Sequence, residues 1–142
     1  MRSDLFHNVN PLPLFAPKAA VTDNTAQVSS IIPTAGYDSL TFVLVTGTDA
    51  DADATFSVLV EDGDDSALSD AATVAAANLL GTVALAGYTF ADDGKTRKIG
   101  YIGNKAYVRV TVTPSANTGN MFLGGVAILG HPRNAPTANP PA

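Results

Sequence analysis

The sequence predicts an all-β domain, folded as an antiparallel β-sandwich or barrel, from three observations. Several segments alternate apolar and polar residues with period two, the signature of a half-buried strand. Two further segments are apolar on both faces, as expected of central strands in a sandwich. Turns rich in Pro, Gly, Asn and Asp separate these segments. Strands recurring at this spacing favour a sandwich or barrel over other folds.

Six segments are strand candidates. The alternating ones are 54–60 and 107–113; in the second, Val108, Val110 and Val112 share one face. Segments 39–47 and 121–130 are apolar on both faces, and 26–32 and 96–103 are weaker candidates. The paired Gly124 and Gly125 in the middle of 121–130 predict a bulge or a close approach of another backbone.

One stretch does not follow the β pattern. Residues 68–82 are rich in alanine, which favours a helix, with Ser69 or Asp70 as the N-cap and Gly81 as the stop. The surrounding strands favour an irregular crossover instead. We expect a short helical or irregular crossover here.

The two ends are rich in proline, which fixes the backbone and removes hydrogen-bond donors. The sequence therefore predicts an extended N-terminal arm over residues 1–18, a β-sandwich domain over 19–131 and a proline-rich tail over 132–142. The apolar residues of the N-terminal arm should bury against this domain or a neighbour; they are Leu5, Phe6, Leu12, Leu14 and Phe15.

Composition excludes several classes of function. The 142 residues suit one domain, and the absence of cysteine excludes disulfides and thiol catalysis. The longest apolar run is too short for a membrane helix of about 20 residues, and no secretory signal is recognisable. A net charge of −5 argues against nucleic-acid binding. We therefore expect a protein that is made in the cytoplasm and binds neither nucleic acid nor membrane.

Charge is unevenly distributed along the chain. Eight of the thirteen acidic residues lie between Asp49 and Asp70, and five of the eight basic residues lie between Lys95 and Arg109. Two interpretations remain open. The two segments meet within one fold or face water separately, or they complement a partner surface and set its orientation.

The acidic stretch Asp49, Asp51 and Asp53 raises the question of a calcium loop. An EF-hand requires Gly at position 6 and Glu at position 12, but Ala54 and Val60 stand there. A looser calcium site that adds Asp62 or Asp64 stays open, beside the simpler interpretation of an exposed acidic turn.

No catalytic, cofactor-binding or metal-binding residue is assigned from the sequence. The two histidines, His7 and His131, fall in the predicted arms or beside them, and no nucleophile motif accompanies them. The glycines of segment 100–105 match no phosphate-binding spacing. We expect no enzyme activity and no cofactor.

Several segments together carry a family resemblance. They are "AVTDNTAQVSSII", "GYDSLTFVLVTGTDADADATFSVLVEDGD", "LSDAA", "NLLGT", "FADDGKTRKIGYIGNKAYVRVTVTP", "NTGN" and "LGHPRNAP". Over about residues 18–137 the chain resembles a family of small tailed-phage and prophage proteins, some of which are capsid decoration, or cement, proteins. The resemblance implies a jelly-roll-like β-sandwich on the outside of an icosahedral shell, where it bridges major capsid subunits.

The sequence therefore predicts a structural virion protein: a homo-oligomer, dimer or trimer, on the outer surface of a phage capsid, with the major capsid protein as partner. The alternative is a receptor- or glycan-binding sandwich module on the same virion. Nine residues are the candidate contacts: Leu12, Leu14 and Phe15 in the arm, Arg97, Lys98 and Arg109 on the basic strands, and Met121, Phe122 and Leu123.

Overall fold

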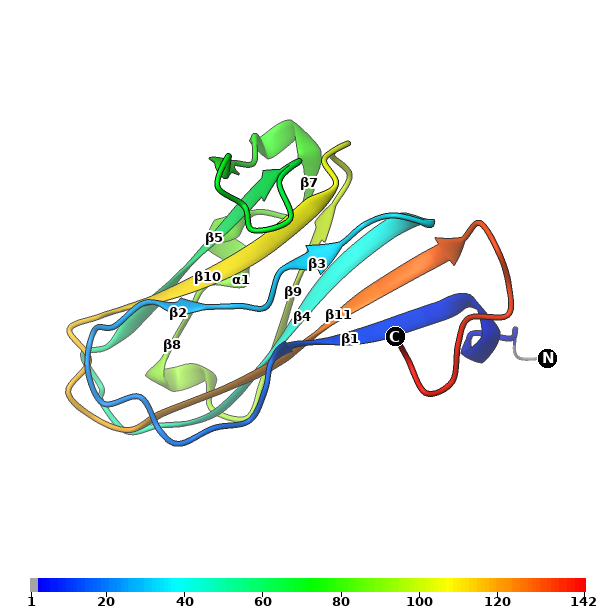
Figure 1. Ribbon diagram of the computed structural model, residues 1–142. Helices are drawn as coiled ribbons and strands as arrows, with labels where there is room; N and C mark the ends of the chain where they lie inside the picture. Colours follow the sequence, from blue (N-terminus) through cyan, green and yellow to red (C-terminus); the bar gives the residue numbers. More distant parts are fainter. Residues whose placement is uncertain (1–2) are drawn as a thin grey trace.

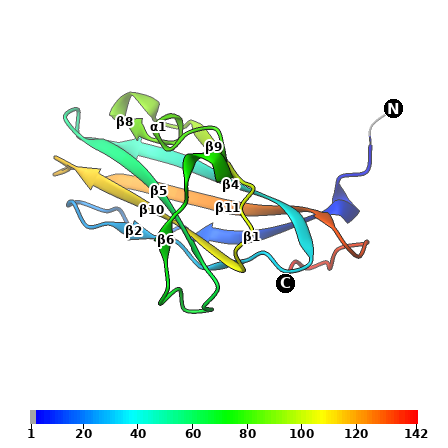
Figure 2. The same cartoon turned by 90° about the horizontal axis from the view of Figure 1, so that it is seen from above.

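The computed structural model describes residues 3–142 and contains two antiparallel sheets packed face to face (Figure 1, Figure 2). The long strands are β1 (Val9–Phe15), β4 (Tyr37–Asp49), β5 (Thr55–Gly63), β9 (Thr96–Tyr101), β10 (Tyr107–Ser115) and β11 (Met121–Pro132). The short strands are β2 (Gln27–Val28), β3 (Ile32–Pro33), β6 (Ala72–Thr73), β7 (Leu79–Leu80) and β8 (Tyr88–Thr89). The helical turns are η1 (Phe6–Asn8), η2 (Ala76–Asn78), α1 (Val83–Ala86) and η3 (Phe90–Asp92).

The strand order identifies the sandwich type. Sheet A has the order β1-β11-β4-β9-β7, and sheet B has the order β2-β10-β5-β6, with β3 pairing with β10 and β8 with β5. From β4 onward, successive long strands alternate between the sheets, and the first and last strands, β1 and β11, are neighbours. This order is that of a jelly roll. The predicted fold class, a jelly-roll-like antiparallel β-sandwich, is confirmed.

The core lies between the sheets and follows the predicted alternation. On β4, Leu40, Phe42 and Leu44 point inward. On β10 of the other sheet, Val108, Val110 and Val112 point inward and are fully buried. Burying an aliphatic or aromatic side chain of this size contributes roughly 1.5–3 kcal/mol to folding. The two inner faces therefore hold the layers together without disulfides.

The segment 68–82 is an irregular crossover, one of the two forms expected. It contains β6, η2 and β7 but no α-helix, and Asp70 accepts hydrogen bonds from the backbone of Asp64 and Asp65 instead of capping a helix. The one α-helical turn in the described chain, α1, begins after Gly81, where the Thr82 hydroxyl accepts a bond from Leu85 N (3.1 Å). The Ala-rich composition thus gave the wrong position for the helix, because alanine propensity alone does not locate a cap.

The two ends of the chain lie together at one end of the sandwich (Figure 1). Part of the predicted N-terminal arm is β1, which pairs with β11 along the edge of sheet A. The tail then lies against β1: Thr137 donates to the carbonyls of His7 (3.0 Å) and Val9 (2.6 Å), and Asn10 donates to Ala142 O (2.8 Å). Both ends therefore make contacts within this chain.

Two β-bulges interrupt sheet A. In the first, two residues of β1 occupy the space of one residue of β11, so that both Leu14 and Phe15 are buried near Gly125. In the second, β4 has one extra residue between Thr46 and Asp49, opposite Phe122. The bulge and close approach predicted around Gly124 and Gly125 are thus present: a Cβ on Gly125 would lie 2.9 Å from Val43 O.

Among residues 3–142, no helix is long and apolar enough to cross a membrane.

Candidate docking surface and polar sites

The outer surface of sheet A is apolar. Because Leu40, Phe42 and Leu44 of β4 point inward, Val43 and Val45 point outward. Register places Val126 of β11 beside Val43, with Lys98 of β9 on its other side. We call this surface the sheet A face; its members are Pro11, Pro13, Thr41, Val43, Val45, Leu80, Thr96, Lys98, Phe122, Val126 and Ile128.

Several large apolar side chains on this face are open to solvent. Val45 is 45% exposed, Phe122 41% and Val126 39%. Glycines on neighbouring strands make room for the larger ones: Gly47 lies against Phe122 Cβ, and Gly100 lies against the Leu80 side chain. Lys98 is the one charged member of the face. Such a contiguous apolar surface is typical of a docking site.

The outer surface of sheet B is different in kind. Its side chains come from the alternate positions of β5 and β10, and most are hydroxyl-bearing or charged, as in Thr55, Ser57, Thr111 and Thr113. Leu59 and Val28 are the apolar exceptions, 37% and 55% exposed. The sandwich is therefore asymmetric: the outer face of sheet B is polar, and the outer face of sheet A is apolar.

The structure separates the nine predicted contact residues. Leu14, Phe15, Met121 and Leu123 are buried in the core of this chain, and Leu12 packs against it. Arg97 and Arg109 each form an ion pair within the chain. Lys98 and Phe122 both lie on the sheet A face. Val43, Val45, Val126 and Ile128, which also lie on this face, were not among the predicted contacts, because a strand that is apolar on both sides does not reveal which side is outward.

The acidic and basic segments meet inside this fold at two places. Arg109 Nε lies 2.9 Å from the carboxylate of Glu61, its direct partner across β10 and β5. Lys105 Nζ lies 2.7 Å from Asp64. A third pair, Arg97 with Asp92 (2.7 Å), joins the basic segment to the turn before β9. Each of these cations therefore has an acidic partner within the chain. This agrees with the interpretation that the acidic and basic segments meet within one fold.

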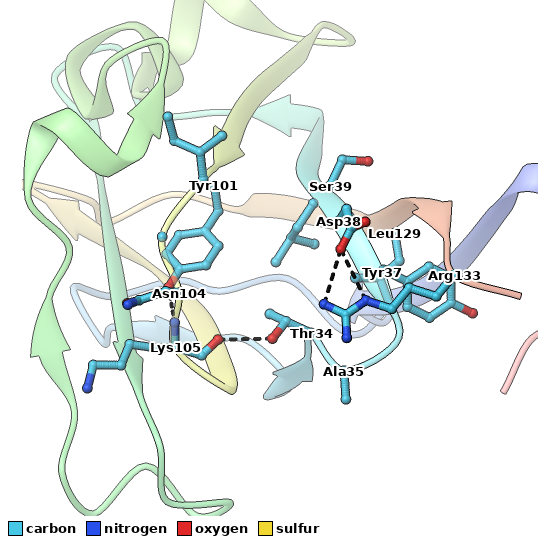
Figure 3. A pocket seen from close by; sticks show the side chains of 13 residues that line it. Thr34, Ala35, Tyr37, Asp38, Ser39, Tyr101, Asn104, Lys105, Leu129 and Arg133 are labelled. Atoms are coloured by element: carbon cyan, nitrogen blue, oxygen red, sulfur yellow. Dashed lines mark hydrogen bonds and ion pairs between the residues drawn. The ribbon is translucent and has the colours of Figure 1, made fainter.

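A pocket opens at the end of the sandwich where the chain termini lie (Figure 3). On one side the Tyr101 hydroxyl donates to Asp62 (2.7 Å) and accepts from Lys105 N (3.0 Å). On the other side Arg133 contacts Asp38 (3.3 Å). Burial, followed by the hydrogen bond to Asp62, raises the pKa of Tyr101 to about 12, so its phenol stays protonated. Thr34 Oγ1 donates to Lys105 O (2.9 Å), and Ser39 also lines the pocket.

Each histidine contacts one polar side chain, and the partner of His131 is Ser39, which lines this pocket. His7 contacts Asp4 (2.6 Å) near the N-terminus, and His131 contacts Ser39 (2.9 Å) at the end of β11. Both are exposed. Neither lies beside the other or beside a buried carboxylate, so the described residues present no catalytic triad.

The acidic stretch 49–53 does not form a single cluster. Asp51 accepts hydrogen bonds from the backbone and hydroxyl of Thr118 (2.8 Å each) and from Asp53 N (3.0 Å), which makes it the organiser of a turn. Asp53 is exposed. Asp49 is 5% exposed, and neither of its carboxylate oxygens has a hydrogen-bond partner. Among residues 3–142, no three acidic or histidine side chains converge in metal-binding geometry.

Comparison with known proteins gives little beyond the fold. No family model matches the chain, and no curated protein matches it. Among matching solved structures is the CBM22-1 and GH10 portion of endo-1,4-beta-D-xylanase 10B from Clostridium thermocellum, complexed with xylohexaose. The identity is 13% and the TM-score is 0.44, with 94% of this chain and 28% of that chain covered. The present chain thus spans under a third of that structure, and a likeness at this level does not extend to function.

Proposed function

We propose that this chain is a structural virion protein that decorates the outside of an assembled phage head, where it acts as a cement between major capsid subunits. The family resemblance supplies the type of partner. The sheet A face is the observation that carries the mode of binding, because an exposed apolar face with one cation is suited to burial against another protein surface.

The edges of sheet A are poorly suited to binding a partner strand. β1 carries Pro11 and Pro13, which have no N–H to donate to an added strand. The other edge, β7, is two residues long. Short or proline-bearing edges discourage edge-to-edge association. Binding through the face of the sheet is therefore favoured over addition of a strand.

Cement activity follows from simple linkage. A protein that binds the assembled shell and not the free subunits stabilises the shell by mass action. Repetition over the lattice then multiplies weak contacts, and a homo-oligomer, dimer or trimer, would engage several subunits at once. No bond-making chemistry is required, in keeping with the expectation that the chain is not an enzyme.

The test is the temperature at which heads of the phage that encodes this chain rupture, with and without added protein. We expect added wild-type protein to raise it. A variant carrying Val45→Asp and Val126→Asp should bind heads at least tenfold more weakly, because two carboxylates would be desolvated on the sheet A face. Thr55→Asp with Thr113→Asp, which has the same diagonal spacing on sheet B, is the matched control and should bind as wild type.

Equal rupture temperatures with and without the protein would contradict the cement role. Saturable binding on a glycan array, with no effect on heads, would support the receptor- or glycan-binding alternative instead. If the sheet B variant lost head binding while the sheet A variant kept it, the cement role would stand and the docking face would be wrong.

A further inference from the structure

An uncompensated carboxylate lies inside the sandwich at the end opposite the chain termini. The side chains of β4 alternate regularly as far as Thr46, which points inward, so an unbroken strand would turn Asp49 outward. The extra residue between Thr46 and Asp49 reverses this alternation. The bulge therefore turns Asp49 into the sandwich, a use of bulges that is common near functional sites.

The turn after η3 is fastened to this end of β4. Thr46 N donates to Lys95 O (2.9 Å), and Gly94 N donates to Gly47 O (3.2 Å). Asp49 N donates to Asp93 Oδ1 (2.8 Å). The carboxylates of Asp49 and Asp93 are thereby held in the same neighbourhood, one buried and one exposed to solvent.

Among residues 3–142, no group neutralises Asp49. Both of its carboxylate oxygens are buried and without a hydrogen bond. The nearby Tyr88 hydroxyl is directed to Met121 Sδ (3.9 Å). Asp92 is also close enough to repel Asp49, yet its own charge is satisfied by Arg97 (2.7 Å) and Lys95 (3.3 Å). A buried carboxylate with no partner is costly, and such groups in folded proteins are normally paired or bound to a metal.

We propose that Asp49 and Asp93 bind a divalent cation that prefers oxygen ligands, with Ca²⁺ as the best match. Carboxylate oxygens are the ligands Ca²⁺ takes, and its flexible coordination lets backbone carbonyls and water complete the shell. With two acidic side chains, the site belongs to the weak class, with a Kd of about 10⁻⁴–10⁻³ M. This site differs from the loop of Asp49, Asp51 and Asp53 considered from sequence, because Asp51 is occupied by Thr118.

The consequence of binding would be mechanical. A cation between Asp49 and Asp93 would join the end of β4 to the turn that leads into β9, two neighbouring strands of sheet A. It would also remove the repulsion between the two carboxylates. The cation would then stabilise the end of the sandwich at which β4 ends and β9 begins. This effect does not depend on whether the chain binds a phage head.

The test is thermal unfolding of the full chain at pH 8, in CaCl₂ or in EDTA, with MgCl₂ at equal ionic strength as the salt control. We expect Ca²⁺ to raise the unfolding temperature saturably, with a midpoint of about 0.1–1 mM, and Mg²⁺ to have a smaller effect. Asp49→Asn should abolish the response to Ca²⁺ and unfold in EDTA at a temperature no lower than wild type. Asp93→Asn should raise the CaCl₂ concentration at the midpoint at least fivefold, and Asp53→Asn should leave that concentration unchanged.

Isothermal titration of wild type with CaCl₂ provides a second measurement should Asp49→Asn fail to fold. A stoichiometry near one that is lost in Asp93→Asn supports the site. Identical unfolding of wild type in Ca²⁺ and EDTA, with no binding heat, would overturn the proposal and leave a proton as the group that neutralises Asp49. A response to Ca²⁺ that persists in both Asn variants would also overturn it.

Discussion

Asp49 and its neighbours illustrate how far a single side chain can depart from the sequence pattern. Asp49, Asp51 and Asp53 alternate evenly in the sequence, and an exposed turn was the simplest interpretation. In the structure Asp51 organises the turn, whereas Asp49 is buried. The difference arises from the bulge in β4, which depends on pairing with β11 and leaves no local signature.

Asp49 gives a prediction for the pH dependence of stability. Burial, with repulsion from Asp93 and Asp92, raises its pKa from 3.8 to about 6 in the folded chain. The native state thus binds this proton more tightly than the unfolded state, so the contribution of Asp49 to stability is greatest below pH 4. That contribution is lost as the pH rises through about 6. The loss is roughly 3 kcal/mol for a shift of this size.

The measurement is urea unfolding in EDTA at pH 4 and pH 7, for wild type and Asp49→Asn. The difference in the free energy of unfolding between the two proteins isolates Asp49. Subtraction is needed because other carboxylates change the stability with pH in the opposite direction. Asp92, for example, has its pKa lowered to about 2 by backbone hydrogen bonding to Thr89 and by Arg97, so it stabilises the fold above pH 4. If the difference in free energy of unfolding between the two proteins were the same at pH 4 and pH 7, the prediction would be contradicted.

At the scale of single elements, most long strands were predictable, whereas of the short ones only β2 and the start of β3 fell in a predicted segment, 26–32. Period-two alternation located β5 and β10, runs apolar on both faces located β4 and β11, and β9 was a weaker candidate. β1 was expected as an extended arm because its prolines mask a strand pattern, and a proline-bearing strand is tolerated only at an edge. The two-residue strands β6, β7 and β8 carry too few residues to show any period.

Gly125 should be essential to the packing of β11 against its neighbours. A Cβ at this position would lie 2.9 Å from Val43 O and 3.3 Å from the Phe15 ring. We expect Gly125→Ala to destabilise the fold by about 1–3 kcal/mol, the usual cost of overpacking. The adjacent Gly124→Ala is the control, because its Cβ would meet nothing closer than 3.9 Å. Chemical unfolding of both variants is the measurement, and equal stabilities would refute the steric argument.

The prolines of β1 should protect the edge of sheet A. Replacing Pro11 and Pro13 with Thr restores two backbone donors, one requirement for adding a further strand. We expect the double variant to keep its fold, by circular dichroism, and to form larger species on incubation, by light scattering. Pro17→Thr, which lies beyond the end of β1, is the matched control and should behave as wild type. Equal scattering by all three proteins would mean that the tail or the twist of the strand suffices to protect the edge.

At the scale of the whole molecule, the sequence predicted a sandwich but not its two unlike faces. Segments 39–47 and 121–130 are apolar on both sides, so either side could have been the core. In the structure the side that carries Leu40, Phe42 and Leu44 faces sheet B, and Gly125 leaves room for Phe15 of β1. This ambiguity is why Met121 and Leu123 of the core were predicted as contacts, while Val45 and Val126 were not. Leu14, also in the core, was predicted because it lies in the proline-rich arm.

The unlike faces lead to a prediction about self-association. If copies of this chain associate through the sheet A face instead of binding the shell with it, apolar burial supplies the free energy, at about 25 cal/mol per Å². One charged side chain on the face leaves little for salt to screen. We therefore expect sedimentation equilibrium to show a dimer or trimer whose Kd changes less than threefold between 0.05 and 0.5 M NaCl. Val126→Asp should shift the equilibrium toward monomer by at least tenfold, and Thr113→Asp on the opposite face should not.

Association that weakens steeply with salt would instead implicate charged loops at the ends of the sandwich, where Asp64, Lys105 and Arg133 lie exposed or half-buried.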